Sequence, residues 1–299
     1  MLEDGTGYRA LDVVTMNYRH DFHAGNFADV FKHIILTRIL LHLLRKETAF
    51  RYIDTHAGSG FYDLFGVEAG KTAEWRAGLG KVIAAEASAS ARELIDPYLR
   101  LAAPAVEEAA DPRHFYPGSP AIAAALLRRQ DRMICCELHP KAAQELQSYL
   151  GRDRRAKIIE IDGFTGLNAF VPPVERRGVA LIDPAFEARD DLDRSLDVLE
   201  SAWRKWGTGI FLLWYPIKDR REVESSLKRL SDGKIKRILR LELQISEPTP
   251  VGPLAANGLL IVNPPFPLAG EAEIILPFLS QAMGEDAGAG HRIEWLAGE

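Results

Sequence analysis

The tetrapeptide Asp183-Pro184-Ala185-Phe186 directly follows an apolar run, Val179 to Ile182, and contains residue types that suit a planar ring bearing an amino group. The Asp183 carboxylate can accept a hydrogen bond from an exocyclic amine, and the Pro184 carbonyl can accept another. The Phe186 ring can stack on the flat face of a base. The chemistry that this turn favours is methylation of adenine at N6, with Asp183, Pro184 and Phe186 as the catalytic residues.

Three other apolar runs also end in an acidic residue. The four residues at these ends are Asp54, Glu137, Asp162 and Asp183. Any one of them could simply cap the helix that follows. In a doubly wound sheet, however, ligands bind outside the carboxyl ends of the strands. Four acidic ends in sequential order therefore favour a binding site along one edge of the sheet.

The residues around these ends favour a cofactor that contains a nucleoside. The turn from Asp54 to Gly60 is glycine-rich, and Gly58 lets the backbone approach a ligand without a clash from Cβ. Glu137 can accept both hydroxyls of a ribose, and Asp162-Gly163 can read an adenine amino group or ring edge. Because the chain shows no basic clamp for phosphates, S-adenosylmethionine is favoured over NAD or ATP.

The segment from Asn17 to His33 is dense in polar and aromatic residues and contains three histidines. Together with His56 they raise the possibility of a metal site, but their spacing matches no helix-borne metal signature. We therefore expect no metal. The plainer alternative, a helix entry with a charged surface, stays open from the residues alone.

The elements that must position these residues alternate along the chain. Strands are expected at 51–54, 132–137, 157–162, 179–183, 209–215, 238–245 and 259–262, and helices at 26–43, 190–206, 219–230 and 274–283. Residues 65–113 are rich in Ala and Glu and predict a helical insertion. The pattern predicts an α/β fold, doubly wound and Rossmann-like, with a mostly parallel seven-stranded sheet.

Bulk properties narrow the class of protein. The chain has 299 residues and a net charge of -5, so any surface that binds nucleic acid must be a local basic patch. The arginine-rich segments 152–155 and 176–177 are candidates for such a patch, although they could equally be ordinary solvated surface. No run reaches the length of a membrane span, and 1–15 does not resemble a signal peptide. We expect 1–15 to be a poorly ordered extension of one domain over 16–299. Adjacent Cys135 and Cys136 are interpreted as reduced core residues of a cytoplasmic protein.

Six segments in the same order resemble the RlmJ-type family, the adenine-N6 methyltransferases of large-subunit ribosomal RNA. The similarity runs from about Met16 to Trp295. The matching segments are Tyr18-Arg19-His20-x-Phe22-His23-Ala24-Gly25-Asn26-x-Ala28-Asp29-Val30-x-Lys32-His33, Asp54-Thr55-His56-Ala57-Gly58-x-Gly60, Tyr116-Pro117-Gly118-Ser119-Pro120, Glu137-Leu138-His139-Pro140, Asp162-Gly163-Phe164 and Trp214-Tyr215-Pro216.

The resemblance implies a class I methyltransferase fold with a small helical subdomain after the first strand. It implies that S-adenosylmethionine is bound by Lys32 or its neighbour His33, and by His56, Ser119, Glu137, Asp162 and Gly163. We expect Gly58 and Asp183 to take part in cofactor binding as well. It assigns the catalytic carboxylate to Asp183 and an RNA contact to Tyr18, with Arg19 and His20 as further candidates. The implied product is N6-methyladenine in 23S rRNA; we expect a monomer that acts on protein-free or early-assembly RNA.

Two features depart from this picture or compete with it. The family pattern at the catalytic turn is Asp-Pro-Pro-Tyr, whereas this chain has Ala185 and Phe186. A second turn, Asn263-Pro264-Pro265-Phe266, also matches the broader pattern of amino methyltransferases, but we interpret it as structural. A DNA adenine-N6 methyltransferase, or a non-catalytic protein that binds RNA or cofactor, therefore stays open as an alternative.

Overall fold

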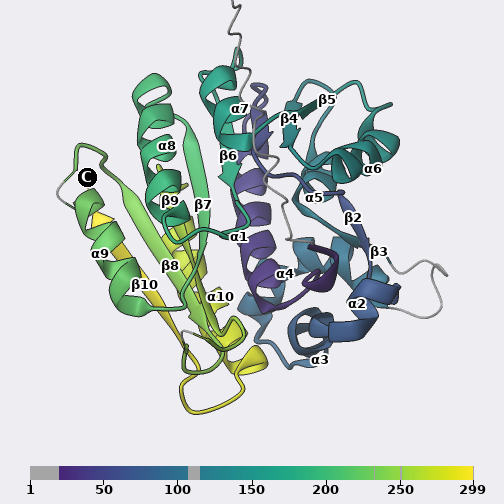
Figure 1. Cartoon of the computed structure of the whole chain (residues 1–299), viewed down its shortest axis with the longest axis vertical. Helices are drawn as coiled ribbons and strands as arrows, with labels where there is room; N and C mark the ends of the chain where they lie inside the picture. The colour runs from purple at the N-terminus through teal and green to yellow at the C-terminus, as the bar shows by residue number, and fades with distance from the viewer. Residues whose placement is uncertain (1–19, 107–114, 232, 250, 299) are drawn as a thin grey trace, which may run out of the picture.

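The computed structural model describes residues 20–106, 115–231, 233–249 and 251–298. The expected extension at 1–15, and Tyr18 and Arg19, lie outside the described residues. Within them the chain forms one large sheet with strand order β10-β8-β9-β7-β6-β1-β4-β5, and a separate hairpin of β2 and β3 (Figure 1).

The half of the sheet that matters for the site is parallel. It contains β1 (Arg51–Asp54), β4 (Arg132–Glu137), β5 (Ala156–Glu160), β6 (Gly178–Ile182) and β7 (Ile210–Pro216). All five residues of β6 are buried, as expected for a strand covered on both faces. The carboxyl ends of these strands share one edge of the sheet, where the acidic residues were expected to gather.

The prediction of seven strands in the sheet is wrong, because the sheet has eight. The seven expected strands are present, and β8 (Ile238–Gln244) and β9 (Ala256–Val262) are among them. The eighth is β10 (Gly290–Ala297), which pairs antiparallel with β8 at the sheet's end. Its residues are mostly only half-buried, since it is an edge strand. It therefore lacks the continuous apolar run that marks the central strands.

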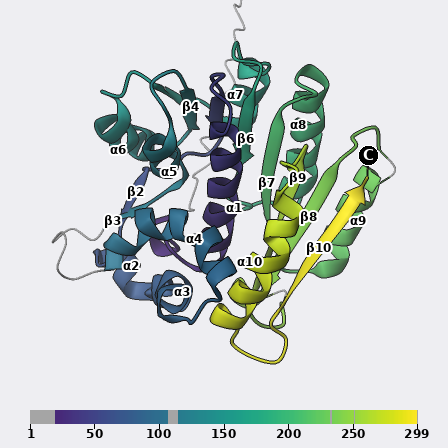
Figure 2. The ribbon, with the colours of Figure 1, turned by 180° about the vertical axis from the view of Figure 1, so that it is seen from behind.

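Helices cover both faces of the sheet. One face carries α7 (Gly163–Phe170), α8 (Asp191–Lys205) and α9 (Arg220–Ser231), whose apolar side chains form one core cluster. The other carries α1 (Phe27–Leu44), α5 (Ser119–Leu126), α6 (Pro140–Leu150) and α10 (Leu268–Met283), in a second cluster. Figure 1 shows α8 and α9 in front of the sheet, and Figure 2 shows α10 and α4 (Ala89–Ala102) from behind. None of the helices in the described ranges combines the length and apolar character that crossing a bilayer requires.

Helix α1 lies between the sheet and the segment that follows β1, so it is buried on nearly all sides. The Asn26 side chain caps it by accepting the backbone N–H groups of Ala28 and Asp29, both at 3.0 Å. Its burial extends to three ionisable residues, Asp29, Lys32 and His33. Buried charges must be paired, so these side chains require polar partners within the fold.

The expected helical insertion at 65–113 lies between the two strands of a hairpin. Between β2 (Phe61–Asp63) and β3 (Phe115–Pro117) the chain forms α2 (Val67–Thr72), a π-helical turn (Arg76–Gly80), α3 (Lys81–Ala84), α4 (Ala89–Ala102) and a 3-10 turn (Ala103–Val106). Ile95, Tyr98 and Leu99 of α4 join the same core cluster as α1. Residues 107–113 lie outside the described part of the chain, and the division into a domain and a subdomain stays a prediction.

Candidate active site

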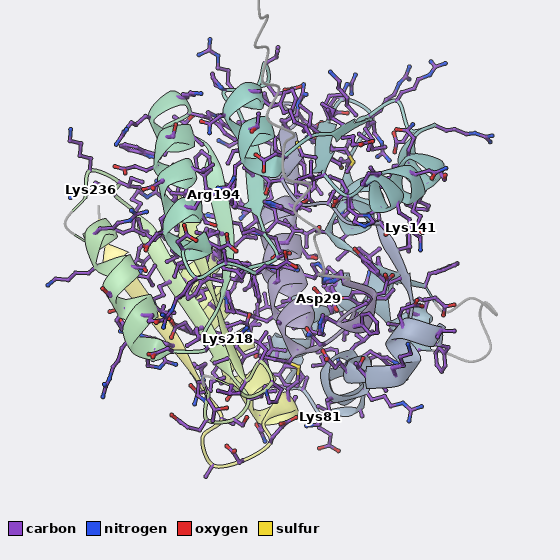
Figure 3. All side chains as sticks on the ribbon, in the orientation of Figure 1. Asp29, Lys81, Lys141, Arg194, Lys218 and Lys236 are labelled. Carbon is purple, nitrogen blue, oxygen red and sulfur yellow. The ribbon has the colours of Figure 1, made fainter. Side chains whose placement is uncertain are left out.

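A cavity of about 590 Å³ opens at the carboxyl edge of the parallel strands, a volume typical of small-molecule sites. It brings together eleven of the predicted site residues. These are His20, Lys32, His33, His56, Gly58, Ser119, Glu137, Asp162, Asp183, Pro184 and Phe186. Lys141 on α6 and Arg194 on α8, both labelled in Figure 3, also line the cavity, which therefore extends from α6 to α8.

Asp183 lies immediately after β6 and is joined to α1 by an ion pair. The Lys32 ammonium donates to Asp183 Oδ2 at 2.5 Å, and its Nζ also lies 2.9 Å from Asp29 Oδ1. Burial alone would lower the pKa of Lys32, but the carboxylates of Asp183 and Asp29 outweigh it and hold that pKa above its ordinary value. Lys32 therefore stays charged and fixes the Asp183 carboxylate at the cavity wall.

Asp29, labelled in Figure 3, is the second carboxylate on this lysine and was not among the predicted site residues. It is only 2% exposed, accepts the Gly25 N–H at 3.1 Å, and lies 2.8 Å from His20 Nε2. Burial works to raise the pKa of Asp29, but His20 and Lys32 hold it well below its ordinary value. A continuous polar chain thus leads from His20 through Asp29 and Lys32 to Asp183.

The turn that contains Asp183 holds Phe186 in an uncommon backbone conformation. Its φ is +51°, in the left-handed region that non-glycine residues seldom adopt. The ring lies edge-on to Trp214, with centroids 5.5 Å apart and planes at 70°. Such strain persists only where the surroundings impose it, and it is concentrated at functional sites. Here it places an aromatic ring beside the Asp183 carboxylate.

The competing turn at Asn263 lies at the other edge of the sheet. Val262, the last residue of β9, pairs with Phe211 near the start of β7, whereas Asp183 follows the end of β6. The Asn263 amide donates to the carbonyls of Gly207 and Gly209, which ties the turn to the loop before β7. None of its residues lines the cavity, so its position is consistent with the interpretation of this turn as structural.

Glu137, the last residue of β4, connects two loops at the cavity. Its Oε2 accepts the Gly58 N–H and its Oε1 accepts the His139 N–H, both at 2.7 Å. Each carboxylate oxygen has a further lone pair, so both can also accept hydroxyls from a ribose. Gly58 has φ +62°, and a Cβ there would lie 2.1 Å from Tyr62 Oη, which explains why glycine is required.

Asp162 caps α7 and also lines the cavity, so it fits both the interpretation as a helix cap and the interpretation as a cofactor-binding residue. Its Oδ1 accepts from both the backbone N–H and the hydroxyl of Thr165 at 2.8 Å. Its Oδ2 lies 3.8 Å from the Arg194 guanidinium and stays at the cavity wall. Gly163 does not line the cavity. A Cβ on it would lie 2.0 Å from the Thr55 carbonyl, so glycine lets α7 pack against the turn after β1.

Asp54, unlike the other three acidic ends, lies beneath the cavity floor. It is fully buried, and its Oδ2 accepts the hydroxyls of Tyr52 at 2.6 Å and Ser119 at 2.7 Å. Burial raises the pKa of Asp54 to about 6. Its role in the geometry is to orient Ser119, which does reach the cavity.

Two histidines that line the cavity, the buried His33 and the half-buried His56, supply neutral ring nitrogens. Burial lowers the pKa of His33 to about 3 and that of His56 to about 4. His33 Nδ1 bonds to the Tyr116 hydroxyl at 2.7 Å, whereas its Nε2 is buried without a hydrogen-bond partner in the described structure. A buried polar atom without a partner at a cavity wall is a place for a ligand atom.

The donor set of the cavity fits a nucleoside with an attached sulfonium rather than a phosphate ester. Its cations Lys32, Lys141 and Arg194 each lie within 4 Å of a carboxylate. No group of three or more His, Cys, Asp or Glu side chains among the described residues could hold a metal ion. Lys141 and Arg194 were missed from the sequence because charged residues near the start of a helix are common on any surface.

Comparisons with known proteins show which family the chain is similar to. The family model described as Ribosomal RNA large subunit methyltransferase D, RlmJ, matches residues 47–297. Two proteins named Ribosomal RNA large subunit methyltransferase J are 36% identical over 284 residues (Haemophilus influenzae) and 34% identical over 293 residues (Escherichia coli K12). Each match covers 95% of this chain and all of the relative.

A crystal structure of a protein from Legionella pneumophila superposes with a TM-score of 0.80 at 32% identity. The superposition covers 91% of this chain and 98% of the other. The fold and nearly the whole length are therefore shared. The chain belongs to the RlmJ family of large-subunit ribosomal RNA methyltransferases.

Proposed function

We propose that this chain transfers a methyl group from S-adenosylmethionine to N6 of an adenine in 23S rRNA, with Asp183 as the catalytic carboxylate. Family membership supports the reaction and the kind of substrate. The observation that carries the assignment of residues is the Lys32–Asp183 ion pair at the wall of the cavity that Glu137 and Asp162 also line.

Different residues of the cavity would bind the ribose, the adenine and the rest of the cofactor. Glu137 accepts the ribose hydroxyls, while the backbone at Gly58 allows the sugar to come close. Asp162 would accept from the adenine edge, and His56 and Ser119 would complete the wall. Gly163 would act indirectly, because it lets α7 pack against the turn after β1. His33 Nε2, one of two buried side-chain polar atoms without a hydrogen-bond partner in the described structure, lies at this cavity. When bound, S-adenosylmethionine supplies an electrophilic methyl group on its sulfonium.

At the catalytic turn, Asp183 and the Pro184 carbonyl would accept hydrogen bonds from the two N–H bonds of the adenine amine. The amine's lone pair is delocalised into the ring, and these bonds favour the pyramidal nitrogen that can attack. Positive charge would develop on N6 as the methyl group transfers and its bond to sulfur breaks. The fixed Asp183 carboxylate would stabilise this charge and accept the N6 proton, which becomes acidic only as the new bond forms. Lys32 and Asp29 hold that carboxylate in position, so little reorganisation is needed.

Phe186 would hold the adenine by stacking once the base has left its own stack. The base must be unpaired to enter, which favours protein-free RNA or an early assembly stage as the substrate. Tyr18, Arg19 and His20 are the proposed RNA contacts, and the described one, His20, lines the cavity. We also propose that the chain acts as a monomer in the cytoplasm.

The test is transfer of labelled methyl from S-adenosylmethionine to 23S rRNA that lacks its own methylation, with DNA of the same sequence beside it. Nucleoside analysis should find label in N6-methyladenine from RNA alone. Label in the DNA at an equal rate would instead support a DNA methyltransferase. Cofactor binding with no label in either would support a non-catalytic protein and contradict the proposal.

A further inference from the structure

The edge of the sheet opposite the cavity is strongly basic. Arginines stand at or directly before the first residue of four adjacent strands, Arg177 before β6, Arg51 in β1, Arg132 in β4 and Arg155 before β5. The segments 45–51, 128–132, 152–155 and 175–177 lead into these strands; we call them the arginine edge. They hold eleven basic and four acidic residues in a chain whose net charge is -5.

A hollow of about 490 Å³ lies on this edge, lined by Arg129, Arg132, Arg154, Arg155 and Asp153. Two of its arginines are fixed by the fold. Arg155 pairs with Asp153 at 2.6 Å and donates to the Ala124 carbonyl, and Arg132 donates to the carbonyls of Arg129 and Asp131. The one acidic side chain that lines the hollow is thus already neutralised by an arginine.

The other two arginines of the hollow are available. Arg129 and Arg154 are exposed, and neither side chain has a hydrogen bond or ion pair within the described structure. Structural pairing therefore does not explain them. A solvated surface normally mixes both signs of charge, whereas here like charges surround one concave place. Such an arrangement favours an anion that touches several guanidinium groups together.

The extent of the edge favours a polyanion over a single small anion. Neighbouring strands lie about 4.8 Å apart, so the starts of four strands cover roughly 14 Å. Because the chain as a whole repels nucleic acid, binding to RNA requires a local field of this kind. The strands of this part of the sheet have four to seven residues, so the two edges are roughly 15–20 Å apart.

We propose that the arginine edge binds the phosphate backbone of the substrate RNA at a second place, away from the target adenine. This inference rests on the proposed RNA methylation. The bound RNA must then extend from the cavity around the sheet to its opposite edge. Arg129 and Arg154 contact phosphates and contribute to affinity, but they do not touch the reacting base.

The test uses the full chain with Arg129→Gln and Arg154→Gln combined, because both side chains are exposed and bear no structural contact. Arg100→Gln combined with Lys236→Gln removes the same charge elsewhere. Lys236, labelled in Figure 3, precedes β8 at the other end of the sheet, and Arg100 lies on α4; both are exposed. Substrates are 23S rRNA and a short hairpin limited to the target adenine and its nearest base pairs.

For the long RNA we expect the KM of the arginine-edge variant to be about tenfold higher than that of the wild type, with kcat unchanged. The slope of log binding constant against log salt concentration should become shallower by about two, because two phosphate contacts are lost. The hairpin and the control variant should show neither change. An unchanged KM and slope on the long RNA, or an equal loss on the hairpin, would overturn the inference. If the wild type methylates no RNA, the proposed function fails instead, and the binding assay still decides whether the edge holds RNA.

Discussion

The Lys32 ammonium lies 2.5 Å from Asp183 Oδ2, although 151 positions separate the two residues in the chain. Asp29 holds the other side of the same ammonium at 2.9 Å. The carboxylate that we propose for catalysis is therefore positioned by a helix from the start of the domain. This connects the stability of the core around α1 with the geometry of the catalytic turn.

Replacing Lys32 with Met should lower the free energy of unfolding by about 3–5 kcal/mol, because two carboxylates lose their shared cation and Asp29 stays buried. Urea denaturation of the purified chain measures it. The double variant Asp29→Asn with Lys32→Met should recover part of this loss, since one uncompensated charge is removed. If the loss in the double variant equals the sum of the losses in Asp29→Asn and Lys32→Met alone, the two side chains are not coupled.

Replacing Gly163 with Ala should destabilise the chain by about 1–3 kcal/mol and weaken binding of S-adenosylmethionine. The new Cβ would lie 2.0 Å from the Thr55 carbonyl, so α7 must move away from the turn that borders the cavity. Gly270→Ala in α10 is the matched control, because a Cβ there meets nothing within 4 Å. The control should gain about 0.5–1 kcal/mol as a helical glycine is replaced. Equal effects at the two sites would contradict this packing argument.

The acidic ends of the strands could be predicted from sequence because each directly follows an apolar run. Glu137, Asp162 and Asp183 indeed meet at one cavity. Asp54 has the same local pattern but lies below the floor, since its neighbours Tyr52 and Ser119 enclose it. Local sequence indicates that a residue ends a strand, but not whether its side chain is covered by other residues.

His33 should make stability depend on pH. Its pKa is lowered to about 3 by burial, and Lys32 and His20 also lower it while Asp29 opposes them. Below pH 6.5 the unfolded chain therefore binds a proton that the folded chain does not, so this residue's stabilisation is present above pH 6.5 and falls as pH decreases toward 3. Asp54, with its pKa raised to about 6, acts in the opposite direction between pH 6 and 4.

Because these effects oppose each other, the difference between wild type and His33→Gln isolates the histidine. From pH 7 to pH 5, the variant should lose about 2 kcal/mol less unfolding free energy than the wild type. Denaturant titrations at several pH values measure it, with exposed His291→Gln as the control. Parallel curves for wild type and His33→Gln would show that His33 does not titrate in this way.

Phe186→Leu should reduce kcat/KM roughly 5- to 150-fold through the loss of stacking, which contributes about 1–3 kcal/mol per base. Phe186→Tyr keeps the ring and should stay close to the wild type. Steady-state methylation of 23S rRNA at saturating cofactor measures both. Circular dichroism checks that the ring's contact with Trp214 is not needed for folding. A Leu variant as active as the Tyr variant would exclude stacking by this residue.

The features that sequence reasoning missed depend on contacts between distant segments. Asp29 resembles an ordinary first-turn helix residue, and only the packing of α1 on all sides shows that it is buried. Strand β10 is mostly half-exposed at a sheet edge, and β2 and β3 have three residues each. Short or exposed strands carry too little periodicity to be recognised.

The central claim is that Asp183 carries the methyl transfer. The measurement is single-turnover methylation of unmethylated 23S rRNA by wild type, Asp183→Ala and Asp183→Asn, with S-adenosylmethionine binding measured by calorimetry on the same samples. We predict that both variants stay folded and bind cofactor, while the rate of label transfer falls by at least about a hundredfold. A variant that retains binding and transfers label within about tenfold of the wild-type rate would contradict the account.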